Sequence, residues 1–131
     1  MFSTPQLNIY SEDVVRSVEF YRSVGFKETF RTPREGVPIH VELDLDGFKL
    51  GIASVASAVA DHGLDLDLSK PGRSMEVALW TDDADAAFAR LTAAGARALS
   101  EPHDWLDGTL RVAWVADPDG NPIELVQRRS Q

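Results

Sequence analysis

Cysteine, basic charge and long hydrophobic runs are all scarce in this sequence of 131 residues. The absence of cysteine excludes disulfides, thiolate zinc sites and cysteine nucleophiles, and it is compatible with a reducing compartment. The 13 Lys and Arg residues are scattered and are outnumbered by 21 Asp and Glu residues, which gives a formal net charge of −8. Because nucleic-acid binding depends on concentrated positive charge, this balance argues against a nucleic-acid partner.

Membrane and export signals are also missing from the sequence. No hydrophobic run approaches the length of a membrane span, and the first residues show no basic segment followed by an apolar stretch. We therefore expect a cytoplasmic protein with no membrane partner. The length fits one domain, residues 1–131, which can bury roughly two thirds of the surface that its unfolded chain exposes.

The sequence contains an internal duplication. The stretch 6–25 aligns without gaps on 76–95, so that Leu7 meets Val77 and Gly25 meets Gly95. A second alignment, with a slightly larger offset, lays 46–52 on 119–125. A repeat of this length that occurs twice is typical of a duplicated supersecondary module rather than of a solenoid. Two such modules are expected to leave a cleft between them, and a cleft is where function should be sought.

Each half of the sequence has the pattern of a strand, a helix and three further strands. In the first half, residues 6–10 alternate polar and apolar side chains, Asp13 is among the N-cap candidates, and Gly25 stands where a helix C-terminus favours a positive φ. The stretch 54–73 between the halves has room for a short helix. The expected strands are 6–10, 26–32, 39–45 and 48–53 in the first half, and 76–80, 98–102, 110–116 and 123–126 in the second.

These patterns resemble the vicinal oxygen chelate superfamily, which includes glyoxalase I, bleomycin-resistance proteins, ring-cleaving dioxygenases and fosfomycin-resistance enzymes. The resemblance rests on the first helix ending in Phe20-Tyr21, on the late motif Asp117-Pro118-Asp119-Gly120-Asn121-Pro122-Ile123-Glu124-Leu125, and on the duplication. It implies an α+β fold of two βαβββ modules with pseudo-twofold symmetry, which form a curved cup for a divalent metal or a small ligand. Module one would cover residues 5–57, the linker 58–73 and module two 74–127. Dimers are common in this superfamily, so the resemblance also predicts a homodimer.

The metal ligands of the superfamily can be carried over position by position. Gln6 falls on the first-strand position, where the superfamily uses His or Gln. Gly51 falls on a position where glyoxalase I has a Glu donor, and glycine has no side chain to offer. Glu76 falls where the superfamily usually has His, and Glu124 matches the terminal Glu ligand. The resemblance thus implies a metal set of Gln6, Glu76 and Glu124, without imidazole.

Oxygen donors of this kind suit Mg²⁺ or Mn²⁺ better than Zn²⁺, Ni²⁺ or Fe²⁺. We expect Glu76 and Glu124 to face each other across the pseudo-twofold axis with Gln6 close by. Without a metal, the two carboxylates would raise each other's proton affinity, and one could serve as a general acid or base. The alternative is that both are solvated or hydrogen-bonded acids in a polar cup without metal.

Aromatic residues and one histidine form the predicted ligand-binding set. By strand alternation, His40 and Glu42 share the face that is not in the core. Trp80 lies on the strand face of Glu76, and Trp105 lies in the loop 102–108. Together with Trp114 they could form an apolar wall for a flat ligand. His62 and His103 are most simply surface residues, in the linker and in the loop before the seventh strand. The predicted ligand-binding residues are Tyr10, His40, Trp80, Trp105 and Trp114.

Three functions remain open from the sequence. The first is a protein that binds or sequesters a small organic molecule in the cup between modules without the usual His-based metal site. The second is a divalent-metal-dependent lyase, isomerase or transferase that uses Gln6, Glu76 and Glu124. The third, a purely structural dimer module, is the least attractive because the expected cup is polar.

Overall fold

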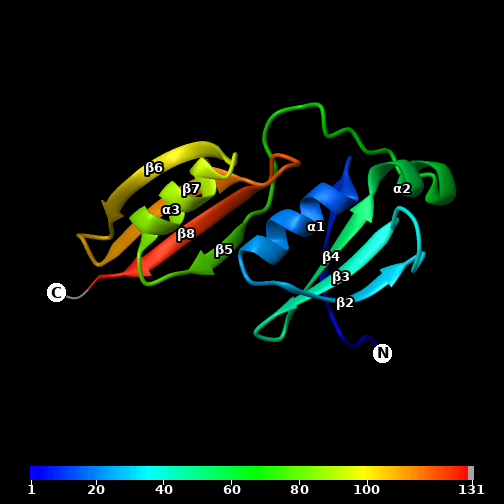
Figure 1. Ribbon diagram of the computed structural model, residues 1–131, viewed down its shortest axis with the longest axis horizontal. Coiled ribbons are helices and arrows are strands. Elements are labelled where there is room, and N and C mark those ends of the chain that lie inside the picture. The colour runs from blue at the N-terminus through cyan, green and yellow to red at the C-terminus, as the bar shows by residue number, and fades with distance from the viewer. Residues whose placement is uncertain (130–131) are drawn as a thin grey trace. The chain divides into compact units, whose positions relative to one another are not determined.

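The computed structural model describes residues 1–129 and divides into two compact units, Met1–Lys70 and Pro71–Gln131. Each unit contains a four-stranded sheet with one helix between its first and second strands, and the first unit has an additional helix (Figure 1). This architecture confirms the predicted α+β class and the two βαβββ modules. None of the helices in residues 1–129 is long and apolar enough to span a bilayer.

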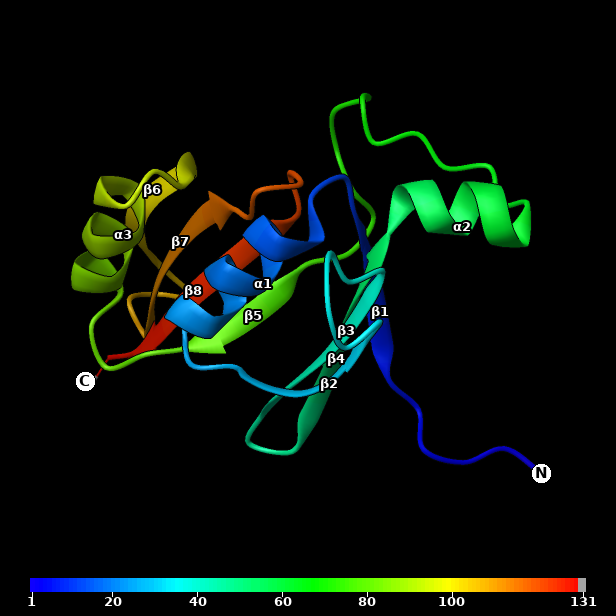
Figure 2. The same cartoon turned by 45° about the vertical axis from the view of Figure 1, so that its right-hand side comes forward.

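The first unit has its strands in the order β1-β4-β3-β2, with β1 parallel to β4 and the other neighbours antiparallel. The short helix expected after the fourth strand is α2, which continues directly from the end of β4 (Figure 2). In chain order the elements are β1 (Leu7–Ser11), α1 (Val14–Ser23), β2 (Lys27–Thr32), β3 (His40–Leu45), β4 (Phe48–Ser54) and α2 (Val55–His62).

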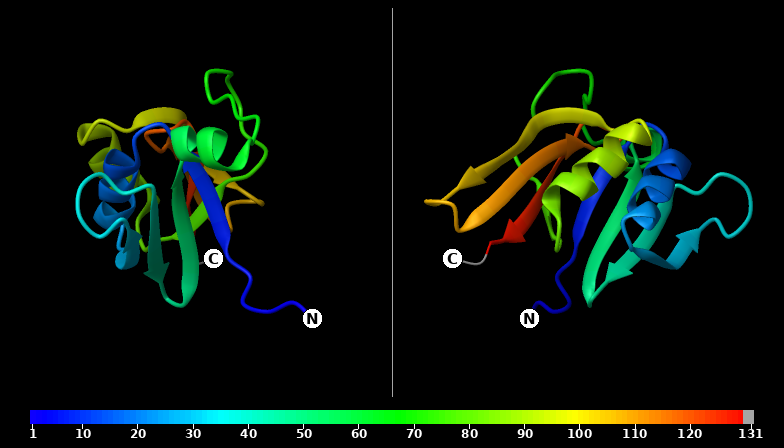
Figure 3. Two further views of the ribbon diagram at one scale, coloured as in Figure 1. Left: turned by 90° about the vertical axis from the view of Figure 1, so that its right-hand side faces the viewer. Right: turned by 60° about the vertical axis from the view of Figure 1, so that its left-hand side comes forward.

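The second unit repeats this plan in the order β5-β8-β7-β6, again with one parallel pair, β5 and β8. Its single helix lies over one face of the sheet, as the right-hand view of Figure 3 shows. The elements are β5 (Val77–Trp80), α3 (Ala84–Ala93), β6 (Arg97–Trp105), β7 (Leu110–Ala116) and β8 (Pro122–Arg128).

The strand register confirms the duplication read from the sequence. Leu7 of β1 is paired with Leu50 of β4, and Val77 of β5 is paired with Ile123 of β8. Leu7 aligns with Val77 in the first sequence alignment, and Leu50 aligns with Ile123 in the second. The duplication is therefore one of hydrogen-bond register as well as of sequence.

Equivalent aspartates begin the two long helices. Asp13 Oδ1 accepts a hydrogen bond from the backbone N–H of Arg16 at 3.1 Å, and Asp83 Oδ1 accepts one from that of Ala86 at 2.9 Å. Each bond satisfies an N–H that has no partner within the helix. Shortly after each helix, Gly25 and its counterpart in the second unit adopt positive φ angles of 114° and 105°. The predicted N-caps and glycine stops are thus confirmed.

Each sheet buries one face beneath its long helix. In the first unit, Tyr21 of α1 is fully buried and packs edge-on against Phe26, with ring centroids 5.6 Å apart. The second unit uses smaller side chains, and Leu91 of α3 stands at the position equivalent to Tyr21. Buried strand residues on the helix-covered faces include Val41, Leu43, Leu50 and Ile52 in the first unit and Ala113, Val115, Ile123 and Leu125 in the second.

The sixth strand corrects the sequence prediction. It was expected to end at residue 102, but β6 runs to Trp105, so His103 and Trp105 lie in a strand rather than in a loop. The pairing of β6 with β7 contains two register irregularities, one between Ala98 and Ser100 and one between Ser100 and His103. Such bulges let a strand accommodate Pro102, whose missing N–H would otherwise interrupt the ladder.

Candidate functional site

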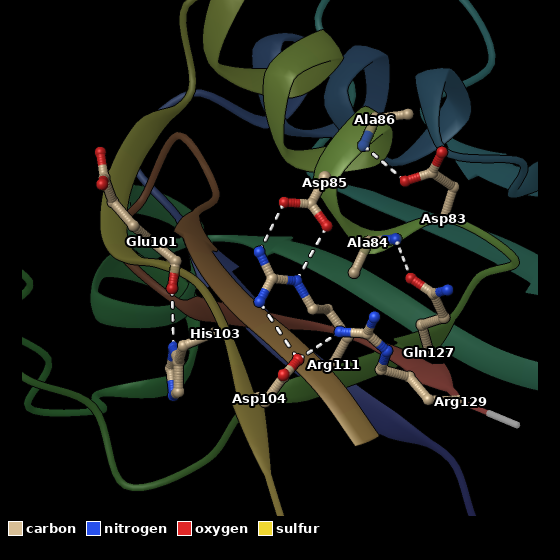
Figure 4. Close-up of polar contacts among 10 residues, drawn as sticks. All are labelled: Asp83, Ala84, Asp85, Ala86, Glu101, His103, Asp104, Arg111, Gln127 and Arg129. Atoms are coloured by element: carbon tan, nitrogen blue, oxygen red, sulfur yellow. Dashed lines mark hydrogen bonds and ion pairs between the residues drawn. The ribbon is translucent and has the colours of Figure 1, made fainter. Parts of the chain in front are cut away.

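The two faces of the second sheet can be distinguished by their contacts with α3. Figure 4 shows Gln127 Oε1 accepting the backbone N–H of Ala84 at 2.8 Å, and Arg111 binding both carboxylate oxygens of Asp85 at 2.9 Å. These side chains therefore mark the helix-covered face. Because side chains alternate along a strand, their neighbours in β7 and β8 point to the other face, which we call the open face of the second sheet.

Glu76, Trp114 and Glu124 are in contact on this open face. Trp114 Nε1 donates a hydrogen bond of 3.0 Å to Glu76 Oε1, and Trp114 is paired with Glu124 in the β7–β8 ladder. The pKa of Glu124 is raised, first by burial, then by a hydrogen bond with Glu76 and by that residue's charge. Burial and the neighbouring carboxylate thus both make a negative charge on Glu124 less favourable.

The two carboxylates were predicted to face each other across the pseudo-twofold axis with Gln6 close by. Both residues belong to the second unit, as the predicted module boundaries imply, with Glu76 immediately before β5 and Glu124 in β8, the parallel neighbour of β5. Their position relative to that axis stays a prediction. The duplication pairs each Glu with a residue of the first unit, Gln6 and Gly51, and not with the other Glu.

Further aromatic residues belong to the same sheet as the carboxyl pair. The ring of His103 stacks on Trp114 with centroids 6.2 Å apart and planes inclined by 25°, and His103 Nδ1–H donates to the carbonyl of Glu101 at 2.7 Å (Figure 4). Trp80 is 58% exposed, and the guanidinium carbon of Arg128 lies 4.5 Å from its ring centroid. Trp105, paired with Leu110 at the end of β6, is exposed.

His103 is the residue that sequence reasoning placed least well. It was interpreted as a surface residue of a loop, but it lies in β6 and touches a predicted ligand-binding tryptophan. The pairing of His103 with Val112, on the same face as Trp114, follows from the bulge between Ser100 and His103. Strand alternation alone could not have found it, because a bulge shifts the alternation by one residue.

The remaining predicted site residues lie on the open face of the first sheet, the face away from α1. Tyr10 of β1 and His40 of β3 are both half-buried and are both paired with Ala53 of β4. Gln6, just before β1, donates from Nε2 to Glu42 Oε2 at 3.4 Å. The structure thus divides the predicted set, with Gln6, Tyr10 and His40 in the first unit and Glu76, Trp80, Trp105, Trp114 and Glu124 in the second.

The metal centre implied by the resemblance can be tested against these residues. Within residues 1–129, no three His, Asp or Glu side chains gather so that they could hold a metal ion. At Gly51, a Cβ would lie 2.0 Å from Asn8 Oδ1, so the amide of Asn8 fills the space where the superfamily places a ligand side chain. The residues present therefore do not fit an imidazole-containing, four-ligand centre of the glyoxalase I type.

Comparison with known proteins agrees with this fold. The chain is 36% identical over 118 residues to a probable lactoylglutathione lyase of Vibrio cholerae, covering 89% of this chain and 84% of that protein. It is 30% identical over 122 residues to YwbC of Bacillus subtilis, covering 92% and 93%. The crystal structure of a glyoxalase-related enzyme from Fulvimarina pelagi superposes with a TM-score of 0.76 at 25% identity, covering 98% of this chain and 89% of that one.

A family-level comparison covers almost the same part of the chain. Residues 4–125 match the Glyoxalase/Bleomycin resistance protein/Dioxygenase superfamily. That range contains β1 to β7 and the first half of β8. The match includes the duplicated modules and the motif from Asp117 to Leu125. This chain belongs to the Glyoxalase/Bleomycin resistance protein/Dioxygenase superfamily.

Proposed function

We propose that this protein binds a small, flat organic molecule with a basic group on the open face of the second sheet. The observation that carries the proposal is the contact between the Glu76 and Glu124 carboxyl groups beside the ring of Trp114. A basic group of a ligand can offset the negative charge of the two carboxyl groups, and the indole ring can pack against the flat part of the same molecule.

The electrostatics of the face support a cationic ligand. The ring of Trp80 already makes a cation–π contact, because the guanidinium group of Arg128 lies over it. Aromatic faces attract cations through their quadrupole, and a ligand cation could use the same surface. The net charge of −8 favours the approach of a cation over that of an anion.

Tryptophan fluorescence offers a direct test, since Trp80, Trp105 and Trp114 all lie in the second unit. Aminoacridine serves as a flat cation, and anthracene carboxylate serves as a flat anion with a related ring system. We expect aminoacridine to quench the fluorescence in a saturable way and to bind more tightly than the anion. Trp114→Leu and Trp80→Leu should each weaken binding by about 1 kcal/mol or more.

Glu124→Gln separates charge recognition from stacking. This substitution keeps a hydrogen-bonding side chain but removes one of the two acidic groups, so we expect aminoacridine affinity to fall toward that of the anion. Binding that is unchanged in Trp80→Leu, Trp114→Leu and Glu124→Gln would exclude this face as the site.

The second candidate is a divalent-metal-dependent lyase, isomerase or transferase that uses Gln6, Glu76 and Glu124. It is favoured by the contact between the two carboxyl groups, since paired carboxylates suit Mg²⁺ or Mn²⁺. The relative from Vibrio cholerae that is named a probable lactoylglutathione lyase also favours it. Metal analysis of protein purified without chelator, together with a lactoylglutathione lyase assay with and without Mn²⁺, tests this candidate. Stoichiometric metal and metal-dependent activity would support it over simple binding.

A homodimer remains part of the proposal. Phe30 and Phe48 of the first unit are 50% and 47% exposed, and exposed aromatic side chains of this kind often become buried between subunits. Sedimentation at micromolar concentration is expected to give twice the mass of the 14.4 kDa chain. A monomer under these conditions would count against the dimer.

A further inference from the structure

A second group of polar side chains lies entirely within the first unit, on the open face of its sheet. Glu42 Oε2 is its centre, with His40 Nε2 at 3.3 Å and Gln6 Nε2 at 3.4 Å. Gln6 Nε2 also donates to Asn8 Oδ1 at 2.9 Å. The four residues come from β3, from β1 and from the residue just before β1, and these two strands lie on either side of β4 (Figure 2).

Gly51 of β4 makes this convergence possible. Gly51 is paired with Asn8 on one side and with Glu42 on the other, so it lies at the middle of the group. A Cβ at this position would lie 2.0 Å from Asn8 Oδ1 and 3.0 Å from His40 Cε1. Both side chains therefore lean over the backbone of β4, into the space that a larger residue would fill.

We propose that His40, Glu42 and Asn8 form a binding site for a divalent transition-metal ion such as Zn²⁺ or Co²⁺. The imidazole nitrogen and the carboxylate are strong ligands for such ions, and the Asn8 amide oxygen supplies a third donor. Atoms bound to one such ion at about 2.0 to 2.2 Å lie about 3 Å apart. The 3.3 Å between His40 Nε2 and Glu42 Oε2 fits this spacing.

The side-chain nitrogen of Gln6 lies between the oxygens that would bind the cation. Its amide N–H groups reach the two acceptor oxygens, Asn8 Oδ1 and Glu42 Oε2, that would otherwise turn toward a metal. Rotating the Gln6 amide by half a turn exchanges its nitrogen for its oxygen, so the same side chain could become a fourth donor. The hydrogen bond from His40 and then that from Gln6 lower the pKa of Glu42.

The site is distinct from the set of Gln6, Glu76 and Glu124 considered above. Its imidazole and carboxylate come from β3, a strand that supplies none of the superfamily positions carried over from the sequence, and all of its donors belong to the first unit. It also provides the nitrogen ligand that the other set lacks. The two sites therefore differ in the ions that they should prefer.

Calorimetric titration of chelator-treated full-length protein with Zn²⁺ tests the proposal, and titration with Co²⁺ adds a visible absorption band that reports the coordination geometry of the ion. We expect one equivalent to bind. His40→Ala and Glu42→Gln should each weaken binding at least tenfold, because even changes outside the ligand shell commonly have effects of about that size. Absence of Zn²⁺ binding by the wild-type protein would overturn the proposal.

Matched controls separate this site from nonspecific binding. His62→Ala removes an exposed histidine at the end of α2, and Glu19→Gln removes an exposed glutamate of α1, so neither should alter Zn²⁺ affinity. Loss of Zn²⁺ binding in Glu124→Gln but not in His40→Ala would show that the ion binds in the second unit, which would overturn the proposal.

Gly51→Ala provides a variant that does not remove any ligand. Gly51 has no positive φ, so alanine is compatible with its backbone, and its Cβ would displace the flexible end of Asn8 and press on the His40 ring. We expect Zn²⁺ affinity to fall severalfold while the melting temperature confirms that the sheet is intact. Unchanged affinity in both Gly51→Ala and His40→Ala would contradict the proposed site.

Discussion

The two units bury equivalent faces and expose different ones. Beneath α1 and α3 the sheets share their register, their caps and their buried strand positions. On the open faces, the first sheet carries a polar group around Gly51, whereas the second carries a carboxyl pair among tryptophans. The same backbone plan therefore supports two kinds of surface, because alternating side chains let one face change while the other keeps its packing.

The equivalent turns before β4 and β8 show how the copies have diverged in detail. Asp44 of the first unit accepts one backbone N–H, that of Gly47, at 3.2 Å. Asp117, its counterpart in the second unit, is buried and accepts the N–H groups of Asp119 and Asn121 as well as the Asn121 side chain. The superfamily motif in the second unit thus forms a turn with more side-chain hydrogen bonds than its counterpart in the first unit.

The largest effect is expected from truncating the aromatic core of the first unit. Tyr21→Ala should lower the free energy of unfolding by about 4 kcal/mol, because it removes a fully buried ring with two edge-on aromatic partners. Leu91→Ala, the matched change in the second unit, should cost about 3 kcal/mol. Urea denaturation followed by circular dichroism measures both values. An equal or larger loss for Leu91→Ala would show that the two cores do not differ in this way.

The next largest effect is expected at the turn aspartates. Asp117→Ala leaves three half-buried N–H donors of Asp119 and Asn121 without their acceptor and should destabilise the protein by about 2 kcal/mol. Asp44→Ala should cost about 1 kcal/mol or less, since one bond in an exposed turn is lost. The comparison requires denaturation curves for both variants under the same conditions. Equal losses would refute the claim that the second turn is the more important one.

A smaller effect is expected from the ion pairs on the helix-covered side of the second sheet. Arg111 bridges Asp85 and Asp104, and Arg129 also contacts Asp104 (Figure 4). Because the acids are exposed, Arg111→Gln should destabilise the protein less than Asp117→Ala, and the loss should shrink at high salt. In the first unit, Arg31→Gln breaks the single Arg31–Glu28 pair and should cost less. Thermal melts at low and high salt measure both effects.

The smallest effects are expected in the pH dependence of stability, and they should have opposite signs on the two open faces. The pKa of Glu42 is lowered below its ordinary 4.5 by its bonds to His40 and Gln6. Its contribution to stability is therefore present above about pH 4.5 and is lost as the pH falls through the lowered pKa. The pKa of Glu124 is raised, so its contribution is present below about pH 4.5 and is lost as the pH rises through the raised pKa.

Two variants test these signs. Glu42→Gln should lower the melting temperature more at neutral than at acid pH. Glu124→Gln should become more favourable relative to wild type as the pH rises, because the variant no longer brings a second negative charge beside Glu76. Melting curves from about pH 3 to pH 7 provide the measurement. Parallel curves for wild type and either variant would contradict the corresponding shift.

The sequence predicted the elements better than the contacts between side chains. The strand 110–116 and the short helix after β4 were expected and are present. The end of β6 was wrong because the bulges that carry the strand past Pro102 leave no simple alternation to read. The sequence placed Glu76 and Glu124 in the same module, but their contacts with Trp114 depend on the pairing of β8 with both β5 and β7.

By itself, the sequence determined the α+β class, the duplication and the superfamily, because hydrophobic alternation, N-caps and turn motifs are local and recur in the same order in both halves. Only the tertiary structure decided which polar side chains meet. Asn8 and His40 come together because Gly51 leaves room between them, and Trp114 reaches Glu76 because β7 and the segment that begins β5 lie on either side of β8 in the second sheet. Such contacts depend on pairing between strands that are distant in the chain, and that pairing is set by packing of the whole sheet rather than by any short segment.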